Sequence, residues 1–282
     1  MSVFRQVSKN GSCYLLEIGK SYGAVNFDMI KGMIPFLFIL GAVVGSFLNV
    51  VGLRWDSRNF GGRSICPSCF KILRWFELVP VLSFLIQKGR CRNCGTNISY
   101  QYPLVELWTG LIFLSTYNLQ LTTYNKLIFI LVFCIYIVIT IYDLRHKIIP
   151  DELVYAAILL SVVGRWLSGG STLDWLAGPI LFTFFGTIWL FSRGRAMGFG
   201  DAKLGLSVGL LFGASLGFSA IILAFWIGAF GSLVYLFLDK VGFLKNAKGL
   251  TMKSEIPFAP FIVIGAWMSL VFHLNIFYVI LF

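Results

Sequence analysis

Residues 126–143 read KLIFILVFCIYIVITIYD, with no charged side chain between Lys126 and Asp143. A hydrocarbon core about 30 Å thick is crossed by roughly 20 apolar residues in an α-helix, and this stretch is close to that length. Backbone N–H and C=O groups cannot be left unpaired in lipid, and these residues do not alternate as they would in a β-barrel strand. The stretch therefore predicts a membrane-spanning helix with an acidic residue at its end.

Similar apolar stretches occupy most of the chain. Together with the first, they lie at 33–53, 103–120, 126–142, 152–168, 174–192, 203–214, 217–238 and 258–281. The sixth is short and rich in glycine, and only Gly-Ala-Ser-Leu-Gly at 213–217 separates it from the seventh. The sequence therefore predicts about eight transmembrane helices.

The composition excludes several other classes of protein. Of the 282 residues, 58% are hydrophobic and only 12% are charged, whereas a soluble domain carries roughly 25% charged residues. A soluble globule of this composition would aggregate, and a disordered chain would not hold 28 Phe and 8 Trp. A net charge of +11 often indicates nucleic-acid binding, but here the basic residues are diluted among apolar runs. We therefore expect membrane lipid, and no nucleic acid, as a partner.

The basic residues also predict an orientation in the membrane. Seventeen of the 23 Lys and Arg residues lie in four loops that the order of the spans places on one side, at 54–102, 143–151, 193–203 and 239–257. The loops on the other side hold only Lys126 and Arg165. Cytoplasmic loops are enriched in Lys and Arg, so the first set is expected in the cytoplasm and both termini outside.

The long polar segment 54–102 contains two Cys-x-x-Cys pairs, Cys66 with Cys69 and Cys91 with Cys94, separated by 21 residues. Two such knuckles are typical of a tetrahedral zinc site, whose four protein ligands make it structural rather than catalytic. The segment is too small to bury a core of its own, so a bound metal would stabilise it. Disulfides or free thiols are the alternative, but disulfides are rare in the reducing cytoplasm.

These observations divide the chain into four predicted parts. The fold class is an all-α polytopic membrane protein with a small cytoplasmic zinc-ribbon-like domain between helices 1 and 2. Residues 1–28 lack the apolar core of a secretory signal, and we interpret 1–32 as a dispensable N-terminal extension. The parts are this extension, the first helix at 33–53, the zinc-binding domain at 54–102 and a seven-helix membrane domain at 103–282.

Acidic residues that border spans are costly and suggest function. Asp143 ends the third span, and Asp201 follows Gly198-Phe199-Gly200 at the start of the sixth, on the same predicted face. Two carboxyl groups that share a site are driven to different protonation states, so one can activate water while the other protonates an amide leaving group. Gly198 and Gly200 would allow close approach of a substrate strand. The alternative is that these acids only neutralise nearby basic residues.

The sequence resembles the type IV prepilin peptidases, which are leader peptidases and N-methyltransferases. The resemblance covers nearly all of 33–282, with its motifs in order. They are GSFLNV at 45–50 with Arg54, the two cysteine knuckles with KGRC at 88–91, YPLVEL at 102–107, Asp143 with IPD at 149–151, and GFGDAK at 198–203.

The resemblance implies an aspartic protease of the Gly-x-Gly-Asp class with Asp143 and Asp201 as the catalytic pair. Lys203 matches the family's basic residue after the motif, and Asp151 matches its second acidic position. The resemblance makes the membrane domain at 103–282 the protease domain. It implies that this domain cleaves the basic leader of prepilin or pseudopilin substrates at the cytoplasmic face of the bacterial inner membrane. It also implies methylation of the new N-terminus with S-adenosylmethionine as donor.

No Gly-rich nucleotide motif marks a site for this donor. The resemblance points to Gly89 and Arg90, where Arg replaces the Lys of one common form and so changes the hydrogen-bond geometry. Glu106, four residues into the second span, is predicted with them to serve the donor site; the alternatives are that it orients the domain, faces the substrate amine or is a packed interfacial acid. The alternatives for function are a peptidase without methylation, a transporter that uses the acids as proton relays, and a membrane scaffold with a zinc-ribbon docking domain. A transporter would be expected to contain an internal repeat, and none is evident.

Overall fold

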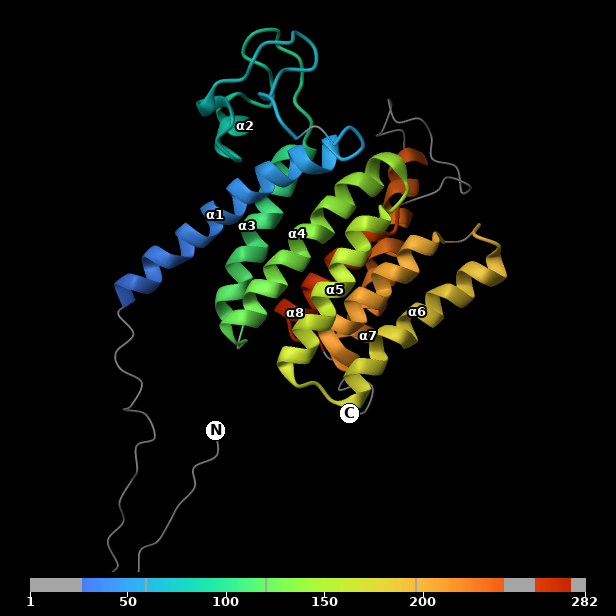
Figure 1. Cartoon of the computed structure of the whole chain (residues 1–282). Coiled ribbons are helices and arrows are strands. Elements are labelled where there is room, and N and C mark those ends of the chain that lie inside the picture. The colour runs from blue at the N-terminus through green and yellow to red at the C-terminus, as the bar shows by residue number, and fades with distance from the viewer. Residues whose placement is uncertain (1–26, 59, 120, 196, 241–256, 275–282) are drawn as a thin grey trace, which may run out of the picture.

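The structure is a computed structural model that describes residues 27–58, 60–119, 121–195, 197–240 and 257–274. A bundle of long helices carries a small irregular segment at one end (Figure 1). In chain order the elements are α1 (Phe27–Arg54), the 3-10 turn η1 (Trp75–Glu77), α2 (Leu82–Ile86), α3 (Gln101–Asn118), α4 (Thr123–His146), α5 (Asp151–Ser168), α6 (Thr172–Ser192), α7 (Phe199–Lys240) and α8 (Ala259–Val271).

The described helices follow the predicted apolar stretches. Four segments are long and apolar enough to cross a membrane, namely Met33–Arg54, Thr123–His146, Thr172–Ser192 and Phe199–Val234. Most boundaries differ from the prediction by a few residues, and the two largest differences are at the ends of the bundle. The first helix begins at Phe27, so six residues assigned to the extension are helical, and α8 ends at Val271. The rest of the predicted extension, 1–26, and the end of the last predicted span, 275–281, lie outside the described residues.

The two predicted spans at 203–214 and 217–238 both fall in α7, which reverses direction at Gly213. The backbone there has φ 75° and ψ −170°, which is not helical. A Cβ atom on Gly217 would lie 3.3 Å from the Cα of Gly209, although eight residues of continuous helix would separate the two by about 12 Å. The segment is therefore a hairpin of two helices, and its glycines allow the close contact.

An ion pair between a buried arginine and a partly exposed aspartate closes this reversal. Arg165 of α5, 8% exposed, donates from Nε to the carbonyl of Leu210 at 2.9 Å and from its NH2 nitrogen to that of Leu211 at 3.0 Å. These are terminal carbonyls of the first half of α7, which lack helical partners. Asp174 of α6 accepts from the backbone N–H of Ala214 at 3.1 Å and lies 4.0 Å from Arg165. The pair thus caps both halves of the hairpin.

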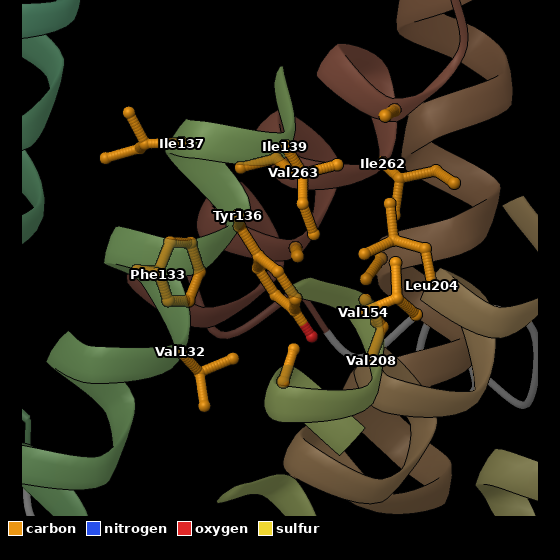
Figure 2. Packing of buried hydrophobic residues seen from close by; sticks show 14 of the residues in the cluster. Val132, Phe133, Tyr136, Ile137, Ile139, Val154, Leu204, Val208, Ile262 and Val263 are labelled. Atoms are coloured by element: carbon orange, nitrogen blue, oxygen red, sulfur yellow. The ribbon is translucent and has the colours of Figure 1, made fainter. Parts of the chain in front are cut away.

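The core of the bundle lies among α4, α5, α7 and α8. Tyr136 of α4 is fully buried, and Figure 2 shows it in one apolar cluster with Val154 of α5 and Val208 of α7. Its hydroxyl pairs with the Ser207 hydroxyl at 2.8 Å, and Ser207 pairs with Ser161 at 3.0 Å. Hydrogen bonding of this kind is needed wherever a polar group is enclosed by apolar side chains. The helices are consequently held in one arrangement by both packing and a polar contact.

Contacts between side chains place three of the predicted same-side loops at one end of the bundle. Asp56, after α1, accepts a hydrogen bond from the Tyr142 hydroxyl of α4 at 2.6 Å. Arg58 pairs with Glu152 of α5 at 2.5 Å. The first turn of α7 is joined to the first turn of α5 in the same region, and the loop before α7 lies beside it (Figure 1). The fourth loop, 239–257, falls almost wholly outside the described residues.

Candidate functional site

The structure brings Asp143 and Asp201 together, although 58 residues separate them in the sequence. Asp143 lies in the last turn of α4 and Asp201 in the first turn of α7. Both are buried, with exposed fractions of 4% and 6%. Their carboxyl groups are close enough for their charges to interact. Two such acids at one buried interface are suited to general acid and base chemistry.

The beginning of α8 completes this site. The backbone N–H of Ala259 donates to Oδ2 of Asp143 at 3.3 Å, and Ala259 is itself buried. The positive end of a helix favours a negatively charged group, so α8 both orients Asp143 and stabilises its carboxylate. The sequence predicted a helix in this segment but did not assign any of its residues to the site. The available signal was Pro257-Phe258-Ala259-Pro260 before an apolar run, since proline is common in the first turn of a helix.

The glycines before Asp201 have different roles in the structure. A Cβ atom on Gly200 would lie 2.8 Å from the Cβ of Ile149, so the glycine lets the start of α7 approach the α4–α5 connection. Gly198 accepts from the backbone N–H of Asp201 at 3.2 Å, and a Cβ on it would be 3.5 Å from Oδ2 of Asp201. Within the described part of the chain, Oδ1 of Asp201 has no hydrogen-bond partner. This oxygen is therefore available to a water molecule or a substrate.

Lys203 binds Asp151 rather than either buried acid. Its Nζ lies 2.6 Å from Oδ1 of Asp151 and 5.1 and 5.3 Å from the ring centres of Tyr155 and Phe199. Asp151 is the first residue of α5, one residue before the start of the predicted span at 152–168. Among the described residues no Lys or Arg forms an ion pair with Asp143 or Asp201. The alternative in which these two acids merely neutralise nearby bases therefore has no support in the described contacts.

The four cysteines of the two knuckles form one cluster. Their sulfur atoms all lie within 4.8 Å of one another, and the Sγ atoms of Cys66 and Cys94 are 3.8 Å apart. A tetrahedral zinc ion with Zn–S bonds of 2.3 Å requires sulfurs about 3.8 Å apart. The described cysteines are free thiols rather than disulfides. The donor set, its spacing and its number therefore fit a structural zinc ion, which Cys66, Cys69, Cys91 and Cys94 would hold.

Each knuckle is built by the same local contacts. One is flanked by an antiparallel bridge between Ile65 and Ile72, and the other by a bridge between Arg90 and Asn97. The N–H of Gly95, whose φ is +72°, closes the second turn by donating to the carbonyl of Cys91 at 2.9 Å.

Two of the four cysteine thiols, those of Cys94 and Cys69, are placed for ionisation. Hydrogen bonds from the side chain and backbone of Thr96 lower the pKa of Cys94 to about 6. Backbone hydrogen bonding by Lys71 and a side-chain hydrogen bond from Asn93 lower the pKa of Cys69. The thiolate is the form that binds zinc, so these contacts favour metal binding near neutral pH.

No contact between the described residues joins the three residues predicted to bind the methyl donor into one site. Gly89, with φ +67°, donates to the carbonyl of Phe84 and so ends α2. Arg90 follows it in the bridge to the second knuckle. Glu106 is buried at the other end of α2, where Oε2 accepts from the N–H of Val81 at 2.7 Å. This is the domain-orienting contact that the sequence allowed for Glu106, and contact with the methyl donor stays a prediction.

Comparison with known proteins agrees with this geometry. Residues 39–119 match a family model described as the bacterial peptidase A24 N-terminal domain, and residues 128–233 match the type IV leader peptidase family. A prepilin leader peptidase/N-methyltransferase of Bacillus subtilis (strain 168) is 30% identical over 249 residues, covering 84% of this chain and 93% of the relative. The chain belongs to the type IV leader peptidase family.

Other members of the family are similar over comparable lengths. A prepilin leader peptidase/N-methyltransferase of Aeromonas hydrophila is 27% identical, over 91% of this chain and 94% of the relative. A type 4 prepilin-like proteins leader peptide-processing enzyme of Escherichia coli O78:H11 is 29% identical, over 65% and 78%. No solved structure was found that matches the chain. The two family models together include both cysteine knuckles and both buried aspartates.

Proposed function

We propose that this protein is a membrane aspartic endopeptidase that removes the leader from prepilin-like proteins and then methylates the new N-terminus. The names of the relatives, prepilin leader peptidase/N-methyltransferase, support both activities. The main support for peptidase activity is that Asp143 and Asp201, two buried acids from different helices, are close enough for their charges to interact. The printed names describe prepilin-like substrates, including one relative that processes their leader peptides.

In the proposed reaction the two carboxyl groups hold one proton between them. The ionised carboxylate takes a proton from water as the water oxygen attacks the scissile carbonyl carbon. The protonated carboxyl donates its proton to the amide nitrogen as the C–N bond breaks, so the products are a leader carboxylate and a new N-terminal amine. The N–H of Ala259 holds Asp143 in place, and Oδ1 of Asp201, which has no partner among the described residues, keeps its hydrogen-bonding capacity for the water or the amide. Burial of both acids limits competing water.

The zinc site has no part in proteolysis. Zinc bound by the four thiolates would cross-link the two knuckles. This would stabilise the segment, whose hydrophobic core is too small for it to fold alone. The chain supplies the rest of the support, through the bridges that flank each knuckle and the contact of Val81 with Glu106. The domain boundaries at 54–102 and 103–282 follow this division and are part of the proposal.

We place the protein in the bacterial cytoplasmic membrane, with the zinc-binding segment and both aspartates on the cytoplasmic side. The support is electrostatic. The loops of the described bundle that share an end with Asp143 and Asp201 carry most of the basic residues, and such loops stay in the cytoplasm. A basic leader would be attracted to the anionic inner leaflet beside these loops, which would bring the substrate to the site.

Methylation is the second activity of the proposal, with S-adenosylmethionine as methyl donor. Methyl transfer requires an unprotonated N-terminal amine, which leader cleavage produces on the same side of the membrane. The names of the relatives support this activity. Gly89, Arg90 and Glu106 are the residues predicted to serve it, and no step is assigned to them.

The test uses the full-length protein in lipid with a prepilin and a labelled methyl donor, and it scores cleavage and methylation separately. Asp143→Asn and Asp201→Asn should each lower the rate of cleavage by about 10²–10⁴-fold or more, the contribution of one general acid or base. Glu152→Gln, which alters an exposed acid in the first turn of α5, is the matched control and should retain cleavage.

A peptide that already lacks its leader separates the two activities. Both aspartate variants should still methylate it, because neither residue lies in the zinc-binding segment. Cleavage by Asp143→Asn or Asp201→Asn at the rate of the unmodified protein would remove that residue from the mechanism. Cleavage without any methyl incorporation would instead support the alternative of a peptidase alone.

A further inference from the structure

The short helix α2 presents three large apolar side chains to the exterior. Leu82, Leu85 and Ile86 are 53%, 64% and 60% exposed. Their spacing of i, i+3 and i+4 puts them on one side of the helix, so they form a continuous apolar face. The neighbouring turn η1 packs against α2 and carries Trp75, which is 80% exposed. Single exposed apolar residues are ordinary, but three on a five-residue helix require a partner.

The attachment of α2 puts this face at the level of the membrane edge. Val81, directly before α2, donates its N–H to Glu106, which is five residues beyond the first residue of α3. At a rise of 1.5 Å per residue, that contact lies about 8 Å along α3 from its beginning. The start of α2 is therefore held beside α3 rather than above it, and Figure 1 shows α2 next to the ends of α1 and α3.

Exposed apolar side chains also occur on α1 and α3 near the end of the bundle that carries α2. Phe47 of α1 and Leu104 of α3 are both exposed near the same end of the bundle. In the membrane-spanning segment Met33–Arg54 such side chains face acyl chains. The α2 face, at the end of this segment, would then lie at the boundary between acyl chains and headgroups.

The charges that follow α2 are complementary to phospholipid headgroups. Lys88, Arg90 and Arg92 come within six residues of the end of the helix. Segment 54–102 contains eight basic and only two acidic residues. Apolar side chains beside basic ones are typical of segments that lie in the membrane interface, because the anionic surface attracts the charges while the apolar face is buried.

We propose that the α2 face, Leu82, Leu85 and Ile86, inserts into the headgroup–acyl boundary of the same membrane. Its partner is phospholipid, including anionic lipid. The zinc-binding segment is then supported at three places, by α1, by α3 and by the bilayer surface under α2. This contact holds the segment low against the membrane beside the end of the bundle that carries the two aspartates. The inference depends on membrane insertion of the bundle and not on the proposed catalysis.

The test measures the depth of α2 in vesicles of phosphatidylethanolamine and phosphatidylglycerol. Leu85→Trp adds an indole to the face, and its emission is obtained by subtracting the spectrum of the unmodified protein. Ser68→Trp, at an exposed position in the first knuckle, is the matched control. Lipids brominated on the acyl carbons nearest the headgroup should quench the indole added at 85 several-fold more than the indole added at 68. Aqueous iodide should show the opposite order.

Zinc content and prepilin cleavage verify that both variants are folded. Equal quenching of the two added indoles by brominated lipid would overturn the proposal. A second result would also overturn it: aqueous iodide quenches the indole at position 85 freely, and adding a prepilin removes this quenching. That result would identify the face as a protein-binding surface. Stronger lipid quenching at 85 in folded protein, unchanged by prepilin, supports it.

Discussion

Replacement of Arg165 by methionine should strongly destabilise the bundle. Met has nearly the same length but cannot donate hydrogen bonds, so the change leaves two carbonyls at the end of a buried helix, those of Leu210 and Leu211, without their partner. It also removes the cation beside Asp174. Hydrogen bonds to a charged group contribute about 1.5–3 kcal/mol each, whereas the pair with Asp174 adds less, because that side chain is 30% exposed and its charge is screened by solvent. We expect the free energy of unfolding to fall by about 3–5 kcal/mol.

The assay is reversible unfolding of the purified protein by titration with SDS in mixed micelles. Lys126→Met is the control, because it removes the other basic residue on that side of the bundle while leaving the α7 reversal intact. Arg165→Lys should give an intermediate loss, since an ammonium group cannot reach two carbonyls as the planar guanidinium does.

The same variant separates stability from chemistry. The first half of α7 carries Asp201 at the end opposite the Arg165 contact, so Arg165→Met should inactivate cleavage at lower temperature and leave the rate in the cold nearly unchanged. A loss of less than about 1 kcal/mol relative to Lys126→Met, the value of an exposed ion pair, would refute the claim that the guanidinium holds the α7 hairpin. Loss of the cleavage rate in the cold with an unchanged free energy of unfolding would also refute that claim.

Four further predictions concern other contacts. Cys91→Ser should abolish zinc binding, because it removes one of four thiolate ligands, and metal analysis of the purified variant should fall from about one equivalent toward none. Glu106→Ala should cost about 1–3 kcal/mol by leaving the Val81 N–H unpaired, and trypsin should then cut the zinc-binding segment faster, whereas Glu106→Gln keeps an acceptor and should resist. Gly213→Ala should cost about 1–3 kcal/mol, because φ is +75° and the new Cβ would collide with Asp174, as SDS unfolding can measure. Asp151→Asn should change stability by less than about 1 kcal/mol, since its carboxylate is largely exposed, and a larger change would show that the Lys203 contact is more than a surface ion pair.

Much of the helical arrangement could be predicted from single residues and their neighbours. The end of α4 near Asp143 and the start of α5 at Asp151 depend on an apolar run and a Pro-Asp pair, which are local signals. The start of α1 was less predictable, because residues 27–32 are mixed in character and join a helix whose apolar part begins at Met33. Helix ends are the least determined by local sequence, since flanking residues of either kind can extend a turn.

The candidate site could be predicted in part. Asp143, Asp201 and the cysteines were found because carboxylates at a membrane edge and paired thiols are rare and chemically specific. Ala259 could not be found this way, because its contribution is a backbone N–H that every residue except proline possesses. Arg165 was predicted only as a charge on one side of the membrane, whereas its side chain is buried and binds backbone carbonyls.

The sequence by itself determined that most of the chain is helical and apolar, and where four thiolates recur at zinc-site spacing. These properties depend on residues close together in the chain, where side-chain chemistry and periodicity decide the outcome. Only the tertiary structure decided that α7 folds back at Gly213, that Glu106 holds Val81, and that α8 meets Asp143 at the interface with Asp201. Those contacts join residues distant in sequence, and they form because helix packing in three dimensions brings complementary groups within reach.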